Sequence, residues 1–167
     1  FFKSALPLEV GPIDRLDFAE FLRRRFAVGN RKASLEFIAK VIDFADGVSG
    51  DVQELCDALW ERSDRGATLD ESALPAAMAC VFSREGGAFE AALARMTPKQ
   101  MRVLRALAER PTAKVFSSDF MEASRMTNPG AMKKTIDRFV SDRLIFQKGD
   151  VYRFFNPFFR EWIREKL

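Results

Sequence analysis

The side chains that usually carry out catalysis are scarce in this chain of 167 residues. It contains no histidine, which excludes Ser-His-Asp and Cys-His catalysis and every zinc site that uses histidine. Its two cysteines, Cys56 and Cys80, stand outside any CxxC pattern, and two thiolates cannot close a zinc site alone. The sequence also lacks the GxGxxG motif and the phosphate loop GxxxxGK followed by Ser or Thr. We therefore predict no catalytic residue, no metal site and no cofactor bound by these residues themselves.

The stretch "RMTNPGAMKKTIDRFVSDRL", residues 125–144, has the cations and the spacing of a helix that contacts DNA. The inward stripe of a helix over 129–143 would consist of Met132, Ile136, Phe139 and Val140. The DNA-binding candidates are Asn128, Lys133, Lys134 and Arg138, with Lys148 and Arg153 in the segment that follows. Asp137 and Asp142 share the outer face, and carboxylates repel phosphates. A packing or regulatory use of this helix is therefore the alternative.

The elements that would position these cations are three helices and a β-hairpin. Thr97 and Pro98 are a strong helix start, and helices are expected over 98–109, 118–124 and 129–143. Gly149-Asp150 then joins two short alternating runs within 145–155, which indicates a hairpin. This order predicts a winged helix-turn-helix domain over residues 98–167.

The first 97 residues read as a helical subdomain. Helices are expected over 14–27, from the N-cap Ser34 onward, over 50–63 and over 70–82, with Gly86-Gly87 as an interruption before a short helix at 88–96. The inward side of 14–27 would consist of Leu16, Phe18, Phe21, Leu22 and Phe26. Residues 5–13 alternate between prolines like a short strand, and we interpret residues 1–13 as the end of a core that belongs to a longer protein. The predicted fold class is thus mainly α, with a small β-hairpin wing.

Charge divides the chain at the same place. Residues 98–167 hold 15 Lys and Arg against 8 Asp and Glu, whereas residues 1–97 hold 12 against 16. A basic C-terminal part behind an acidic N-terminal part is compatible with nucleic-acid binding by the former. No run reaches the length of a membrane span or a signal-peptide core, so we expect a cytoplasmic protein without a membrane partner.

The aromatic tail "FFNPFFREWIREKL" has two interpretations. The rings of Phe158, Phe159 and Trp162 could pack a final helix against the winged helix, which we favour. They could also form a docking surface for another domain, since exposed aromatic patches mark interfaces.

Several motifs in fixed order resemble the C-terminal half of prokaryotic AAA+/STAND-type P-loop ATPases. Gly47 is followed by "VQELCDALW" at 52–60, which fits the pattern V-Q-x-L-C-x-x-L-W of that family. Tyr152, Phe154, Pro157 and Trp162 match the pattern aromatic-x-aromatic-x-D-P-x-x-x-x-W, with Asn156 at the position of the aspartate. The resemblance implies that the first subdomain is an AAA+ lid and that a missing N-terminal core binds ATP and Mg²⁺. It also implies that Gly47, Ser49, Asp51 and Gln53 lie near the nucleotide.

The sequence departs from this family at two points. Where relatives often have His-Pro and two aromatic residues after the glycine, this chain has Val48, Ser49, Gly50 and Asp51, and Asn156 replaces the usual aspartate before Pro157. In addition, no arginine stands at the start of the helix over 50–63, where AAA+ proteins often have a sensor arginine. If this segment senses nucleotide, it would do so through backbone and packing.

Three functions therefore remain open. The first is a regulatory lid and winged helix of an ATPase, which couples nucleotide state in the missing core to a partner or to DNA. The second is a winged-helix DNA-binding transcriptional regulator. The third is a protein-docking module that uses the aromatic tail.

Overall fold

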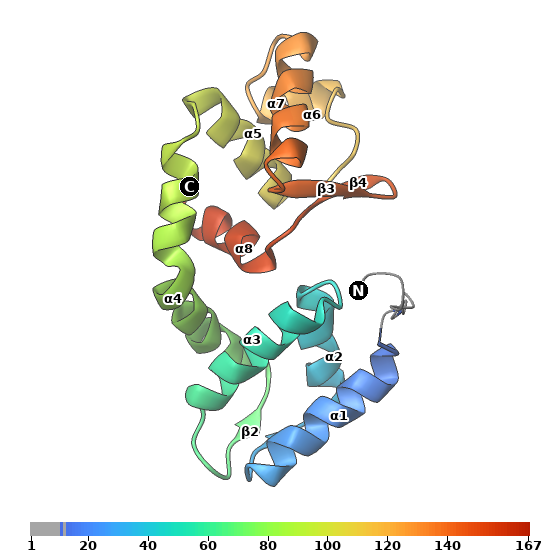
Figure 1. The fold of residues 1–167 in the computed structure, drawn as a ribbon, viewed down its shortest axis with the longest axis vertical. Coiled ribbons are helices and arrows are strands. Elements are labelled where there is room, and N and C mark those ends of the chain that lie inside the picture. Colours follow the sequence, from blue (N-terminus) through green and yellow to red (C-terminus); the bar gives the residue numbers. More distant parts are fainter. Residues whose placement is uncertain (1–10, 12) are drawn as a thin grey trace, which may run out of the picture. The chain divides into compact units, whose positions relative to one another are not determined.

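The computed structural model describes residue 11 and residues 13–167, and it is mainly helical (Figure 1). Contacts between residues divide the chain into a first unit that ends at Pro75 and a second unit, Ala76–Leu167. The predicted class, helical with a small hairpin, is confirmed. The strand expected within 5–13 falls outside the described residues, apart from residues 11 and 13. The domain boundary predicted after Thr97 falls at the start of a helix of the second unit and stays a prediction.

The first unit contains the helices α1 (Arg15–Val28), α2 (Leu35–Phe44) and α3 (Ser49–Glu61). Two short strands, β1 (Lys32–Ala33) and β2 (Thr68–Leu69), pair in parallel and were not expected from the sequence. A 3₁₀ turn, η2 (Glu71–Ala73), then leads into α4 (Leu74–Ala94). Buried aliphatic side chains of α2 and α3 fill the middle of this unit: Ile38, Val41, Ile42, Val52, Leu55 and Leu59.

Local capping explains where these helices begin. The carboxylate of Asp14 accepts hydrogen bonds from the backbone N–H groups of Leu16 and Asp17 at the start of α1. The hydroxyl of Ser34 accepts from the N–H of Phe37, as predicted. Gly47 has φ +76, a conformation that favours glycine, and it turns the chain between α2 and α3.

The inward face predicted for α1 is only partly correct. Phe18 is buried, together with Leu22 and Phe26, but Leu16 and Phe21 are exposed. At about 100° of rotation per residue, both lie well to the side of the stripe that the buried residues share. The helix therefore keeps apolar side chains that this unit does not cover.

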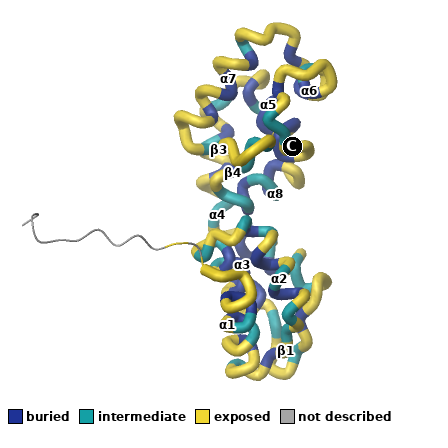
Figure 2. Tube along the Cα trace, turned by 90° about the vertical axis from the view of Figure 1, so that its right-hand side faces the viewer, coloured by how far each residue is buried: buried dark blue, intermediate teal, exposed yellow. Residues whose placement is uncertain are grey.

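The second unit contains a winged helix. Its helices are α5 (Pro98–Glu109), α6 (Ser118–Ala123), α7 (Pro129–Ser141) and α8 (Pro157–Lys166), and its wing is the pair β3 (Ile145–Lys148) and β4 (Val151–Phe154). The two strands are antiparallel, with Lys148 opposite Val151 at the turn, and Gly149 adopts φ +58 there. The predicted hairpin is confirmed. In Figure 2 each helix of this unit presents buried residues on one side and exposed residues on the other.

A capping box starts α5 where the sequence predicted it. The hydroxyl of Thr97 accepts a hydrogen bond from the N–H of Gln100, and the side-chain oxygen of Gln100 accepts one from the N–H of Thr97 at 2.8 Å. Both orphan donors of the first turn are thereby satisfied.

The interruption predicted at Gly86-Gly87 is wrong, because α4 continues through both glycines to Ala94. A helical glycine costs only about 1 kcal/mol relative to alanine. Here the continued helix buries Phe89, whose ring centroid lies 5.1 Å from that of Phe159 and 5.9 Å from that of Trp162. Packing between distant parts of the chain outweighs the local propensity.

Candidate functional surfaces

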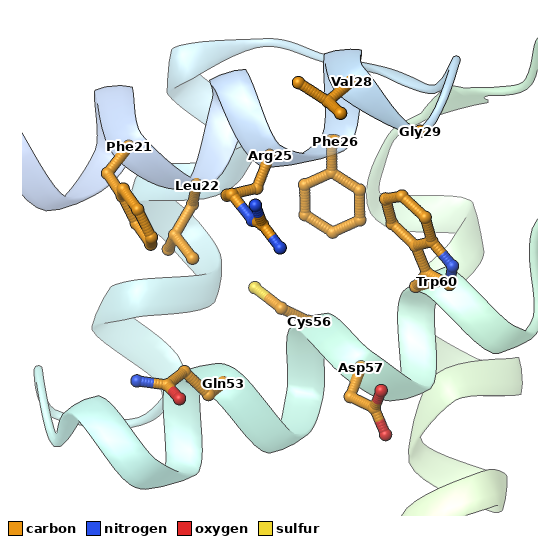
Figure 3. Close-up of a pocket in the computed structure, with 10 residues that line it drawn as sticks. All are labelled: Phe21, Leu22, Arg25, Phe26, Val28, Gly29, Gln53, Cys56, Asp57 and Trp60. Carbon is orange, nitrogen blue, oxygen red and sulfur yellow. The ribbon is translucent and has the colours of Figure 1, made fainter.

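A groove of about 700 Å³ lies between α1 and α3 in the first unit (Figure 3). Its floor is apolar, with Leu22, Phe26 and Cys56 buried, while Phe21 is 55% exposed and Val28 is 82% exposed on its α1 side. The other lining residues are Arg25, Gly29, Gln53, Asp57 and Trp60. The resemblance directs attention to the start of α3, whereas the groove is lined by α3 residues from Gln53 to Trp60.

One end of the groove is built around Trp60. An alanine Cβ at Gly29 would lie only 1.6 Å from Cη2 of the Trp60 ring, so the ring occupies the space that only glycine leaves. On another side the guanidinium of Arg31 lies 4.1 Å from the ring centroid. The ring of Phe26, at 6.0 Å between centroids, completes the enclosure. Trp60 is not fully enclosed, because 36% of its surface remains exposed.

Arg31 is a structural residue that the sequence analysis missed. It is only 9% exposed. Its Nε donates to the Ser63 hydroxyl at 2.8 Å, and its Nη2 donates to the carbonyls of Trp60 and Ser63 at 3.0 and 2.7 Å. Its Nη1 donates to the carbonyl of Gly29 at 3.0 Å. These bonds satisfy carbonyls at the C-terminal end of α3 and place a positive charge at the negative end of its dipole.

The predicted nucleotide-proximal residues gather at one end of α3. Gly47 precedes the helix, Ser49 is its first residue, and Asp51 lies in its first turn. Of the four, only Gln53 lines the groove. Val48, at the N-cap position, makes no side-chain cap hydrogen bond. The proximity of this set to a nucleotide stays a prediction.

The three arginines of the run 23–25 lie in two different environments. Arg23 donates from Nε and Nη2 to the carboxylate of Glu20 at 3.1 and 3.0 Å, and Arg24 lies 3.9 Å from the same carboxylate. Arg25 instead extends from α1 into the groove, toward α3 (Figure 3).

Cys56 on the groove floor is not poised for reaction. Burial raises the pKa of its thiol to about 12, so the thiolate is scarce at neutral pH. Within the described part of the chain, no cluster of three or more cysteine or carboxylate side chains could hold a metal ion.

Most of the predicted DNA-binding residues lie together on the outer face of α7. Two of them form ion pairs with aspartates of the same helix region. Lys133 donates to Asp137 at 2.8 Å, and this hydrogen bond, with the charge of Asp137, raises the pKa of the ammonium group. Arg138 donates to Asp142 at 3.3 Å. Among the described residues Lys134 has no such partner. Internal pairing thus lowers the net positive charge that this face offers to phosphates.

Asn128 caps this helix, so its contact with DNA stays a prediction, and Val140 departs from its predicted position. The side-chain oxygen of Asn128 accepts a hydrogen bond from the N–H of Ala131 at 3.0 Å, so Asn128 is the N-cap of α7. Val140 was predicted to face inward, but it is 43% exposed and that prediction is wrong. Thr135 takes its place in the buried stripe, because its hydroxyl can donate to the carbonyl of Ala131 one turn earlier.

The hairpin places its two candidate cations on one face. Lys148 ends β3 and Arg153 lies on β4 opposite Phe146, two positions before Lys148. Since side chains alternate along a strand and paired residues share a face, both cations lie on the same face of the wing.

The aromatic tail contributes three rings to the core of the second unit. Phe158, Phe159 and Trp162 are all buried, so the packing interpretation describes what they do in this structure. Contact of these rings with a partner would require them to leave that core, and their use for docking stays a prediction.

Asn156 has a role that explains its departure from the aspartate of the family pattern. Its side-chain oxygen caps α8 by accepting from the N–H of Phe159 at 2.8 Å. Its amide nitrogen donates to the Glu85 carboxylate at 3.1 Å. An aspartate could cap the helix but would set a second carboxylate against Glu85.

Comparisons with known proteins agree with this architecture. Residues 87–165 match the model of a family described as a probable winged helix domain, which covers a little under half of the chain. No curated protein matches. A solved structure, the Walker-type ATPase PABY2304 of Pyrococcus abyssi, is similar with a TM-score of 0.66 and 18% sequence identity. The match covers 92% of this chain but only 42% of that ATPase. At this identity the similarity shows a shared fold.

No helix in the described ranges combines the length and the apolar character required to cross a bilayer.

Proposed function

We propose that this chain is the regulatory region of a P-loop ATPase and that it couples the nucleotide state of a core outside these residues to a protein partner or to DNA. The observation that carries the proposal is the order of the two units. A helical unit followed by a winged helix is shared with a Walker-type ATPase over 92% of this chain. The core would bind ATP and Mg²⁺, since these 167 residues contain no phosphate loop.

The first unit supplies the surface that would respond to nucleotide. In the AAA+/STAND-type arrangement, the start of α3 would face the nucleotide, with Gly47, Ser49, Asp51 and Gln53 as the nearest residues. None of them carries a positive charge, so this contact would depend on backbone and packing. A change transmitted along α3 would then reach Trp60 and Arg31 at its other end.

The test uses the complete natural protein that contains this chain. We expect it to hydrolyse ATP and to lose this activity when the lysine of its phosphate loop is replaced. We also expect ATP to change the hydrogen exchange of α3 backbone amides in the intact protein but not in the phosphate-loop variant. A complete protein without a phosphate loop, or one whose α3 exchanges identically with and without ATP, would refute the proposal.

A second function, DNA binding by the winged helix, is favoured by the exposed cations Lys133, Lys134 and Arg138 of α7 and by Lys148 of the wing, whereas Arg153 is half-buried. Contact with four phosphates would give a slope of about −3.6 for the logarithm of the binding constant against that of salt concentration. Replacing Lys133, Lys134 and Arg138 with alanine should weaken binding to all duplexes alike, because phosphate contacts carry no sequence information. Absence of binding at low salt, or unchanged binding by the triple variant, would reject this alternative.

A further inference from the structure

The groove between α1 and α3 leaves uncovered apolar surface within the first unit. Phe21 and Val28 rise from α1, and the outer edge of Trp60 closes one end of the α3 side. Below them the buried side chains of Leu22 and Phe26 form a continuous apolar floor. Contiguous apolar surface of this kind, with polar residues at its rim, marks a binding site more often than scattered exposed residues do.

The walls of the groove have the spacing of a helix-binding site. Phe21, Arg25 and Val28 stand at positions i, i+4 and i+7 of α1, so they lie on one face of that helix. Gln53 and Trp60 are separated by the same seven positions on α3. Seven residues of α-helix span about 10 Å, which sets the length of each wall at about two turns. A helix of two to three turns would match this length and would present its apolar face to the floor.

Charge decides which helix would fit. Arg25 has no ion pair among the described residues, in contrast to Arg23 and Arg24, which both approach Glu20. Its guanidinium extends into the groove above the apolar floor (Figure 3). The carboxylate of Asp57 is turned away from α1 in the same view. The groove therefore presents a cation to its occupant, and the complementary group is a carboxylate.

We propose that this groove binds an amphipathic helix of a partner protein, which inserts apolar side chains at i, i+4 and i+7 and pairs one carboxylate with Arg25. The site uses only side chains of the first unit, so it stands whether or not the proposed ATPase function is correct.

Two fluorescent peptides of 15 residues test this proposal. Each is titrated with the whole 167-residue chain, and binding is followed by fluorescence anisotropy. Both peptides are helix-forming, with leucines at i, i+4 and i+7. One carries glutamate at the positions next to the leucines and the other carries lysine there. We expect saturable binding of the glutamate peptide and about two- to fivefold weaker binding of the lysine peptide, the scale of one exposed charge pair.

Charge reversal and its matched control locate the site. Arg25→Glu should invert the preference, so that the lysine peptide binds more tightly. Arg24→Glu makes the same change of charge on the neighbouring residue, which does not line the groove, and should preserve the preference. Val28→Asp should weaken both peptides, whereas Ala27→Asp, also exposed but outside the groove, should not. Circular dichroism of each variant shows that its helices are intact.

Four binding results would overturn the proposal. They are no saturable binding of either peptide, equal affinities for the two peptides, an unchanged preference in the Arg25→Glu chain, and full binding by the Val28→Asp chain. A dimer of the unmodified chain that Val28→Asp dissociates would instead assign the groove to a second copy, and this too would overturn it.

Discussion

Replacing Gly29 with alanine should destabilise the first unit by about 2 kcal/mol, although glycine-to-alanine changes commonly stabilise proteins. The added Cβ would lie 1.6 Å from Cη2 of Trp60 and 2.3 and 2.4 Å from its Cζ3 and Cζ2 atoms. No adjustment of a few tenths of an ångström relieves such an overlap, so the indole ring must leave its position. It then loses its contacts with Arg31 and Phe26.

The magnitude follows from opposing contributions. Overpacking costs about 1–3 kcal/mol, and the lost cation–π and aromatic contacts cost about 0.5–1 kcal/mol each. In the other direction, alanine restricts the unfolded chain and stabilises by about 0.4–1 kcal/mol. This last contribution applies in full, because Gly29 has φ −83, which alanine adopts without strain. The steric contributions are larger, so the net effect is destabilising.

Chemical denaturation followed by circular dichroism measures the change, and a double-mutant cycle identifies its cause. In a chain that already carries Trp60→Ala, the ring is absent and Gly29→Ala should be neutral or slightly stabilising. Equal stability of the Gly29→Ala chain and the parent would refute the reasoning. An equal loss of stability from Gly29→Ala in the parent and in the Trp60→Ala chain would also refute it, since the clash with Trp60 could not then be the cause.

Three further predictions concern pH and charge. Between about pH 9 and 12 the folded chain keeps the Cys56 proton that the unfolded chain releases, so the free energy of unfolding should fall as pH rises. From pH 8 to 10 the free energy of unfolding of the parent chain should fall by about 1 kcal/mol more than that of a Cys56→Ala chain, as measured by denaturation. The same dependence on pH in both chains would contradict this. Asn156→Asp should lower the free energy of unfolding by about 2 kcal/mol at pH 7, because it replaces the donor to Glu85 with a second carboxylate. Adding Glu85→Gln to this variant should restore much of the lost stability, as measured by thermal denaturation. If the winged helix binds DNA, Asp137→Asn should release Lys133 and steepen the salt slope by up to about 0.9, whereas an unchanged slope would place this pair outside the interface.

Local chemistry made the winged helix predictable. The cap at Thr97 and the hairpin turn at Gly149 are formed by residues within a few positions of one another, as is the cap at Ser34 in the first unit. Their hydrogen bonds satisfy backbone groups that any helix end exposes, so the sequence alone indicates them. The order of these elements was sufficient to predict the fold class and the hairpin.

The candidate site was less predictable, because its parts are distant in the sequence. The sequence pointed to the start of α3, but the groove also needs α1, whose exposed Phe21 and Val28 look like ordinary helix residues. Nothing near Arg31 in the sequence shows that its guanidinium will meet carbonyls 29 and 32 positions later. The continuity of α4 through Gly86 likewise depends on aromatic rings of the C-terminal tail.

The sequence by itself determined where most helices start, where the hairpin turns and that the C-terminal part is basic. Only the tertiary structure decided which of those charges are cancelled by a neighbour, which aromatic rings are core and which apolar faces remain open. The physical reason is that capping and turn preferences act over a few residues, whereas burial and pairing depend on which segments the folded chain brings together.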